Sequence, residues 1–311
     1  MIDTKDNNSI DNCSSVWVDD GSEKNIKATI VKQSLNLDIA VLRISKKTKA
    51  ILMIHNYGGL CNCEKIHKIA LKYNLTIIED FSESLLSRFD NKFLGGQQKN
   101  SKLKIISFSS LHATKSLTTG EGGIITTNSK KTCLNIKNLR DHGVNKFKTY
   151  HYNQIGGNFR LSNILAAIGY SQLSRVNQII KKKREINNLY IKNLKNIEGI
   201  KLQKDLTKSD PIKWGFPIKL RSSISAKKII RGLNKINIKA IPSFVSFNKF
   251  RYLKIYHNKN NNKSDFKNSE LLQNSLIILP LNLKLTKNDI IFICKNIKKI
   301  LGNRISRKKP N

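Results

Sequence analysis

The chain has 311 residues, a formal net charge of +36 and a hydrophobic fraction of 39%. This length allows one large or two moderate domains with a sizeable core, and no apolar run approaches the length of a membrane span. The lysines are spread along the whole chain, together with abundant Asn and Ile, and no nucleic-acid-binding motif accompanies them. We therefore expect no specific nucleic-acid function, although such a charge favours non-specific, salt-dependent association with polyanions.

The start of the chain and its cysteines bear on cellular location. Residues 1–33 are polar and weakly patterned, so we expect a poorly ordered leader, and they contain no apolar signal-peptide core. The five cysteines are an odd number without framework spacing, and Cys61-x-Cys63 has no matching second pair. A zinc site is therefore not expected. Reduced thiols in a cytoplasmic protein are the expected state.

After the leader, strand and helix patterns alternate, which is typical of an α/β sheet. A short helix is expected at 34–45, followed by a strand at 50–54, an amphipathic helix at 61–73 and strands at 75–80, 104–108 and 124–127. A basic helix at 129–141 precedes one long helical pattern at 163–194. The C-terminal part predicts strands at 214–220, 238–241 and 276–279, helices at 226–235 and 288–300, and a polar low-complexity loop at 258–265.

A Ser/Thr/Gly-rich turn between strands 104–108 and 124–127 carries Lys115. A partly desolvated lysine loses its proton more easily and can form a Schiff base with an aldehyde, and hydroxyls and free backbone N–H groups nearby can hold a phosphate. Lysines are mostly exposed, so a lone lysine here would be an ordinary surface residue.

Asp80 changes this interpretation of Lys115. It ends strand 75–80, and ligands of open α/β sheets gather at the carboxyl ends of strands. A strand-end aspartate is most often a helix N-cap, but it can also pair with the pyridinium nitrogen of pyridoxal phosphate. The combination of this strand with the Lys115 turn favours a cofactor site.

Five segments extend this combination into a longer pattern: KAILMIHNYG (49–58), IEDFSES (78–84), SSLHATKSLTTGEGG (109–123), LRDHG (139–143) and GGNFRLSNILAAIGYSQL (156–173). In this order and at this spacing, the chain resembles the DegT/DnrJ/EryC1/StrS aminotransferases. These are pyridoxal-phosphate enzymes that mostly act on nucleotide-linked keto sugars. The resemblance runs from about residue 34 to the end of the chain and weakens after residue 196.

The resemblance implies an α/β fold with two parts. Residues 34–195 would form an incomplete aspartate-aminotransferase-like (fold type I) domain that ends in a long linking helix. Residues 196–311 would form a smaller C-terminal α/β domain. The implied cofactor is pyridoxal 5′-phosphate, with Lys115 in the Schiff-base position, Asp80 on the pyridine nitrogen and Ser110 on the phosphate.

The resemblance also implies less certain roles. Glu83 falls where the family has Gln or His near the cofactor ring. Asn158 matches an asparagine that reaches the phosphate of the neighbouring subunit, which implies a homodimer with shared sites. The roles of His55, His112 and His142 stay open between structure and substrate binding.

The implied reaction transfers an amino group from an amino acid, with glutamate as the expected donor, to the keto group of a nucleotide-linked deoxysugar. Surface polysaccharide or a related glycan would be the end product. Some relatives with the lysine replaced are dehydratases, so the retained Lys115 favours transamination.

Two departures from the family pattern keep a second interpretation open. Before the matching region, the family has a turn at a helix N-terminus that binds the cofactor phosphate, and it also has part of the central sheet. Neither is found before residue 34, so the chain looks N-terminally truncated. Residues 241–244 (IPSF) lack the His-Tyr that the family often carries there. The alternative is a non-catalytic remnant or partner subunit of such an enzyme.

Overall fold

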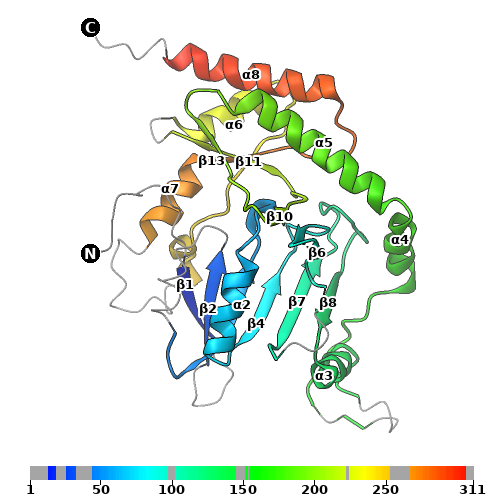
Figure 1. Ribbon diagram of the computed structural model, residues 1–311. Helices are drawn as coiled ribbons and strands as arrows, with labels where there is room; N and C mark the ends of the chain where they lie inside the picture. Colours follow the sequence, from blue (N-terminus) through cyan, green and yellow to red (C-terminus); the bar gives the residue numbers. More distant parts are fainter. Residues whose placement is uncertain are drawn as a thin grey trace.

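The protein is described by a computed structural model that covers residues 13–18, 26–32, 44–96, 102–144, 151–152, 154–221, 224–252 and 266–305. Its larger sheet has six strands in the order β1-β2-β3-β4-β7-β8 (Figure 1). Their bounds are β1 (Cys13–Val18), β2 (Ile26–Lys32), β3 (Thr48–Ile54), β4 (Thr76–Asp80), β7 (Ile105–Ser110) and β8 (Gly123–Thr127). The four strands β2, β3, β4 and β7 are parallel, and the two outer strands are antiparallel to their neighbours. The carboxyl ends of β3, β4 and β7 therefore meet at one edge.

Helix α2 (Cys63–Lys72) covers one face of this sheet. It begins where the Asn62 side chain accepts a hydrogen bond from the Lys65 N–H, which satisfies one of the free donors of the first turn. Ile66 and Ala70 are buried in a core that includes Ile77 of β4. Helix α3 (Lys130–Arg140) is capped in the same way by Ser129 but buries none of its own residues.

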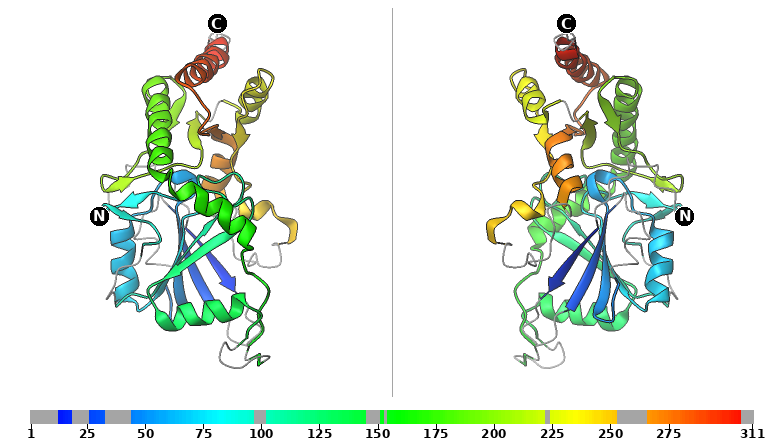
Figure 2. Two further views of the ribbon diagram at one scale, coloured as in Figure 1. Left: turned by 90° about the vertical axis from the view of Figure 1, so that its right-hand side faces the viewer. Right: turned by 90° about the vertical axis from the view of Figure 1, so that its left-hand side faces the viewer.

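The C-terminal part forms a second unit around an antiparallel sheet in the order β12-β13-β11-β9. Its strands are β9 (Ile200–Leu202), β11 (Phe216–Leu220), β12 (Ile241–Pro242) and β13 (Leu276–Leu279), and its helices are α5 (Val176–Leu194), α6 (Ala226–Asn234), α7 (Lys267–Ser275) and α8 (Lys287–Ile305). Ile218, Ile229 and Ile297 lie in one continuous core. Figures 1 and 2 show this unit on the side toward which β2 and β4 point, so it faces the carboxyl edge of the large sheet.

A small third sheet joins the two units. Strand β10 (Ser209–Asp210) pairs with β5 (Arg88–Phe89), which pairs in turn with β6 (Lys92–Phe93). The Ile212 N–H donates to the Ser87 hydroxyl at 2.8 Å, next to this sheet. Two short 3-10 turns, η1 (Asn56–Gly58) and η2 (Phe247–Lys249), also lie among the described elements.

Most expected elements are present, and the α/β fold is confirmed. Strands at β3, β4, β7, β8, β11 and β13 and helices at α2, α3, α6 and α8 lie at the expected places. The expectation of a poorly ordered leader over residues 1–33 is wrong for 13–18 and 26–32, because these segments pair with each other and extend the sheet beside β3. The rest of that range, most of the expected helix at 34–45 and the loop at 258–265 lie outside the described residues.

The single long helix expected over 163–194 is two helices, α4 (Asn163–Leu173) and α5, separated by a turn at Ser174 and Arg175. The Arg175 N–H donates to the Gln172 carbonyl, and this tight turn redirects the chain. Helix α7 and strands β5, β6, β9 and β10 were not expected, since most are too short for a periodic pattern. The domain boundary near residue 195 stays a prediction. Among the described helices, none has both the length and the apolar character needed to cross a membrane.

Candidate functional site

The carboxyl ends of β4 and β7 bring Asp80 and Ser110 into one hydrogen-bonded group. The strands are parallel neighbours, with Asp80 paired to Phe108. Ser82 connects the two ends, because its N–H donates to Asp80 Oδ1 at 3.0 Å and its hydroxyl accepts from the Ser110 N–H at 3.0 Å. Both Asp80 and Ser110 are half-buried.

The turn after β7 presents Lys115. The Ser110 hydroxyl accepts from the His112 N–H at 3.2 Å, and the His112 carbonyl accepts from the Lys115 N–H at 2.9 Å. The Thr118 hydroxyl donates back to the Leu111 carbonyl at 3.0 Å and closes the turn. Lys115 is half-buried, and its Nζ lies 5.0 Å from the centroid of the Trp214 ring.

Gln172 of α4 holds the same turn from outside. Its Nε2 donates to the Thr118 carbonyl at 2.6 Å, and its Oε1 accepts from the Thr118 N–H at 3.3 Å. Sequence reasoning quoted Gln172 within the 156–173 motif but gave it no role. The spacing of 54 residues between the partners leaves no local signal that would have paired them.

Glu83 lies beside the group, but its carboxylate is already engaged. Its Oε2 accepts from the Tyr57 N–H at 2.6 Å, and its backbone carbonyl accepts from the Trp214 N–H at 3.1 Å. Tyr57 has a φ of 53°, in the left-handed region that is uncommon for residues other than glycine. These contacts give Glu83 a part in holding the Tyr57 turn, and its expected place at the cofactor ring stays a prediction.

Asn158 lies apart from this group in the sequence and is exposed. Its Oδ1 accepts from Arg160 Nε at 3.0 Å, and its backbone forms a bridge with Asp141. The structure therefore does not draw Asn158 into the hydrogen-bonded group that contains Asp80 and Ser110. The proposed contact with a neighbouring subunit's phosphate stays a prediction.

The three open histidines differ in their surroundings. His55 is fully buried, and its Nδ1 accepts from the Cys61 N–H at 3.0 Å, so it is a structural residue. His112 is exposed, with Nδ1 3.1 Å from the Thr114 hydroxyl and Nε2 3.6 Å from Glu121. His142 has a φ of 57° and is exposed on the turn after α3.

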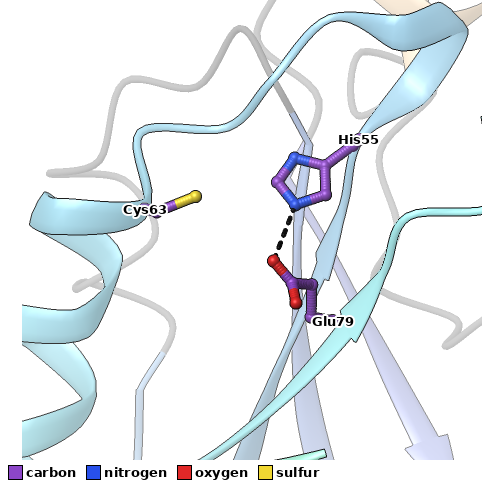
Figure 3. A group of neighbouring side chains, drawn as sticks. All are labelled: His55, Cys63 and Glu79. Atoms are coloured by element: carbon purple, nitrogen blue, oxygen red, sulfur yellow. Dashed lines mark hydrogen bonds and ion pairs between the residues drawn. The ribbon is translucent and has the colours of Figure 1, made fainter. Parts of the chain in front are cut away.

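A buried group of potential metal ligands lies on the opposite face of β4: His55, Cys63 and Glu79, whose donor atoms are all within 4.8 Å of one another (Figure 3). The backbone N–H of Cys61 can only donate, so Nδ1 of His55 must accept and its proton must sit on Nε2. That N–H donates to Glu79 Oε1 at 3.2 Å. Nε2 then has no free lone pair for a metal ion. His55 and Glu79 therefore form a hydrogen-bonded pair, and the Cys63 thiol lies nearby.

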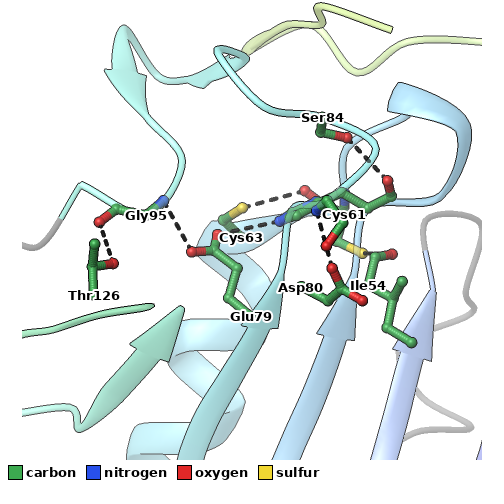
Figure 4. Close-up of polar contacts among 10 residues, drawn as sticks. Ile54, Cys61, Cys63, Glu79, Asp80, Ser84, Gly95 and Thr126 are labelled. Atoms are coloured by element: carbon green, nitrogen blue, oxygen red, sulfur yellow. Dashed lines mark hydrogen bonds and ion pairs between the residues drawn. The ribbon is translucent and has the colours of Figure 1, made fainter. Parts of the chain in front are cut away.

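Glu79 is held in its charged form inside this core. Burial raises its pKa, but hydrogen bonds from His55, Ser107 and the Gly95 N–H outweigh burial, and the net effect lowers the pKa. Figure 4 shows the Gly95 N–H donating to the Glu79 carboxylate. The neighbouring thiols behave oppositely, because burial and the Glu79 charge raise the pKa values of Cys61 and Cys63. Neither thiol is a reactive nucleophile.

The residues at the carboxyl edge fit pyridoxal phosphate. Within the described part of the chain, Asp80 Oδ2 accepts no hydrogen bond, which leaves it available to a protonated ring nitrogen. The Ser110 hydroxyl accepts one bond and keeps its own proton for a phosphate oxygen. Lys115 follows five residues later on a held turn, so an amine, an anion-binding hydroxyl and a carboxylate lie on neighbouring strand ends.

Comparison with known proteins decides the family. The profile of the DegT/DnrJ/EryC1/StrS aminotransferase family matches residues 24–298. The chain belongs to this family. Pyridoxal phosphate is the family's cofactor, as the resemblance implied.

Individual members of the family show how far the similarity extends. An uncharacterised protein from Methanocaldococcus jannaschii is 30% identical over 90% of this chain and 74% of its own length. The GDP-perosamine synthase of Escherichia coli O157:H7 is 37% identical, over 50% of this chain and 41% of its own length. The chain thus covers less than two thirds of that synthase.

Solved structures support the fold. Helicobacter pylori PseC, an aminotransferase involved in the biosynthesis of pseudoaminic acid, superimposes with a TM-score of 0.74 at 27% identity, over 84% of this chain and 69% of PseC. DesV from S. venezuelae superimposes with a TM-score of 0.77 at 18% identity, over 86% of this chain and 68% of DesV. At such low identity, DesV supports the fold type I architecture alone.

Proposed function

We propose that this protein is a pyridoxal-phosphate-dependent aminotransferase that moves an amino group from an amino acid, with glutamate as donor, to the keto group of a nucleotide-linked deoxysugar. The observation that carries the proposal is the group at the carboxyl edge of β4 and β7. Asp80, Ser110 and Lys115 are held there by one set of short hydrogen bonds. A carboxylate, a hydroxyl and an amine are the groups that this cofactor needs.

The names of relatives support the substrate class and leave the nucleotide open. They include a GDP-perosamine synthase, a UDP-4-amino-4,6-dideoxy-N-acetyl-beta-L-altrosamine transaminase from Campylobacter jejuni and a dTDP-4-amino-4,6-dideoxy-D-glucose transaminase from Shigella dysenteriae. Three nucleotides occur at similar identity, so the shared feature is a diphosphate-linked amino sugar. A net charge of +36 attracts such an anionic substrate. The aminated sugar would enter surface polysaccharide or a related glycan.

Each residue of the group has a distinct task in the proposed reaction. When bound, pyridoxal phosphate supplies an electron sink for the carbon that gains or loses the amine. Asp80 would hold the ring nitrogen and keep it protonated, and Ser110 would donate to the phosphate. Lys115 would attach the cofactor through Nζ and then carry a proton at the same atom.

We also propose a homodimer in which Asn158 reaches the neighbouring site. Large apolar side chains are exposed along residues 155–173, on α4 and the segment before it: Ile155, Phe159, Ile164, Ile168, Tyr170 and Leu173. Three of them exceed 75% exposure, namely Ile155 at 97%, Tyr170 at 78% and Ile164 at 77%. Contiguous exposed apolar surface marks an interaction site, and the Asn158 segment lies within it.

The test is capture of the cofactor by Lys115. Purified protein is incubated with pyridoxal phosphate, reduced with borohydride and digested, and the modified peptide is identified by mass spectrometry beside Lys115→Ala. We expect the phosphopyridoxyl group on Lys115 in the parent protein and none at this peptide in the variant. Labelled glutamate and a panel of GDP-, UDP- and dTDP-linked keto sugars then test amino transfer.

The opposite result would favour the alternative function. If borohydride fixes the cofactor equally on the parent protein and on Lys115→Ala, the chain has no working cofactor site. It would then be a non-catalytic relative or partner subunit of an aminotransferase. A cytoplasmic location also stays a prediction; the four cysteines with described side chains are free thiols, as that prediction requires.

A further inference from the structure

Trp214 is the small-unit side chain that reaches Lys115. No role was assigned to it from the sequence. It lies just before β11, and 99 positions separate it from Lys115 in the chain, so no local pattern connects them. Its ring lies 5.0 Å from Lys115 Nζ, within the distance at which an ammonium is attracted to an aromatic face.

Trp214 is held by the two loops that carry the candidate site, once through its backbone and once through its indole. The Trp214 backbone N–H donates to the Glu83 carbonyl at 3.1 Å, in the loop after β4. Its ring Nε1–H donates to the Thr114 carbonyl at 2.9 Å, in the turn after β7. Thr114 directly precedes Lys115, so the ring is fixed relative to the backbone from which the lysine side chain begins.

The backbone beside Trp214 is also immobilised. Lys213 is 3% exposed and its Nζ lies 3.0 Å from Asp205. Gly58 packs against it so closely that a Cβ on Gly58 would lie 2.4 Å from the Lys213 Cα. The position of the Trp214 ring is therefore fixed by its surroundings, and the Lys115 side chain takes a rotamer that fits against it.

We propose that Trp214 is a positioning residue for Lys115: its fixed ring holds the free ammonium of Lys115 at the carboxyl edge of β7 and shields it from solvent reagents. This inference rests on the proposed function, in which Lys115 is the residue that attaches the cofactor. An ammonium on a flexible four-carbon side chain otherwise samples many rotamers. The ring restricts these rotamers while no carbonyl is bound.

The experiment measures the reactivity of Lys115 in the cofactor-free protein. The parent, Trp214→Leu and Trp214→Phe are treated with a limiting amount of an acetylating reagent, and the modification of each lysine is followed by peptide mass spectrometry. We expect Lys115 to react about two- to fivefold faster in Trp214→Leu, because a cation–π contact of this kind is lost. Trp214→Phe keeps an aromatic face and should lie between the parent and Trp214→Leu.

Two other lysines are internal controls. Lys181 is exposed on α5 and should react at the same rate in all three proteins. Lys183 is 5% exposed in the core and should stay unreactive. An unchanged Lys115 rate in Trp214→Leu would contradict the inference, and so would a rise at Lys183 together with Lys115, since that would show general loosening of the fold.

Failure of the inference is distinguishable from failure of the proposed function. If the parent captures pyridoxal phosphate on Lys115 but the rate of Lys115 acetylation does not change in Trp214→Leu, the inference is wrong and the proposed function stands. If Lys115 acetylation depends on Trp214 but the parent captures no cofactor, the contact is supported and the proposed function is wrong.

Discussion

The edge that carries Lys115 and the segment that carries Asn158 are built in opposite ways. At the edge, Asp80, Ser110 and the Lys115 turn are connected by backbone and side-chain hydrogen bonds within one chain. Helix α4, in contrast, buries none of its own residues, although its sequence NILAAIGYSQL is mostly apolar. The first region is held together by contacts within one chain, whereas the second presents exposed apolar surface.

This difference distinguishes two functions, holding the cofactor and contacting a neighbouring subunit, that the family pattern does not separate. Both segments belong to the same family pattern, but the first needs nothing outside the chain to hold its geometry. In the proposed homodimer, the second would gain stability on association, because a partner would cover its apolar surface. We therefore expect the effects of substitutions in the two regions to be detected by different assays.

The largest expected effect is the loss of the dimer. Ile164→Asp places a charge on the exposed apolar surface at the start of α4, so we expect a shift from dimer to monomer in light scattering, with a parallel loss of cofactor capture. The matched control is Lys181→Asp on the exposed side of α5, which should stay dimeric. A parent protein that is monomeric at all concentrations would contradict the proposal.

The second prediction compares a buried isoleucine with an exposed one. Ile66 is 1% exposed and Ile164 is 77% exposed. Ile66→Ala should lower the free energy of unfolding by about 2–5 kcal/mol, because it leaves a cavity under α2. Ile164→Ala should change that of the monomer by less than about 0.5 kcal/mol. Urea unfolding of both variants in an Ile168→Asp background, which places a charge on the same exposed apolar surface of α4, isolates the monomer, and equal losses would refute the contrast.

The third prediction concerns a buried lysine that is held by contacts within one chain. Lys183 of α5 donates to the Leu281 carbonyl at 2.8 Å, and burial lowers its pKa from 10.5 to about 8. Between pH 8 and 10.5 the unfolded chain binds more protons than the folded one, so the stability of the parent rises with pH in this window.

Lys183→Met removes this dependence. Its stability relative to the parent should fall by about 3 kcal/mol as the pH rises from 8 to 10.5, since one pKa unit corresponds to about 1.4 kcal/mol. The carbonyls that lose their donor lower the variant's stability at every pH, so the change with pH is the quantity to measure. Parallel unfolding curves for the two proteins across this window would show that Lys183 titrates normally.

The smallest expected effect tests the shared site. Asn158→Ala should weaken pyridoxal phosphate binding about tenfold, the cost of one lost hydrogen bond to a charged group, without changing the dimer. Asn193→Ala, an exposed asparagine on α5, is the matched control. Cofactor affinity is measured by fluorescence titration, and an unchanged affinity in Asn158→Ala would remove this residue from the site.

The sequence predicted the strands that end in Asp80 and Ser110 because their buried alternation and terminal polar residues are local features. It missed what depends on distant partners. Residues 13–18 (CSSVWV) and 26–32 (IKATIVK) contain β-branched and apolar residues, but the polar stretches around them suggest disorder. They are strands because β2 pairs with the parallel edge of β3 and β1 pairs with β2. The contacts of Lys115 with Trp214, and of Thr118 with Gln172, cross 99 and 54 positions and have no local signature.

The reaction rate of the buried thiols beside β3 measures how often this part of the large sheet opens. Cys61 and Cys63 are 1% and 6% exposed, whereas Cys133 on α3 is half-buried. A disulfide reagent should therefore modify Cys133 within the mixing time and wait for transient unfolding before it reaches the other two. Peptide mass spectrometry separates these two thiols from Cys294, which is buried in the C-terminal unit. The delay at Cys61 and Cys63 then reports how often the region around α2 and the end of β3 opens in the unaltered protein.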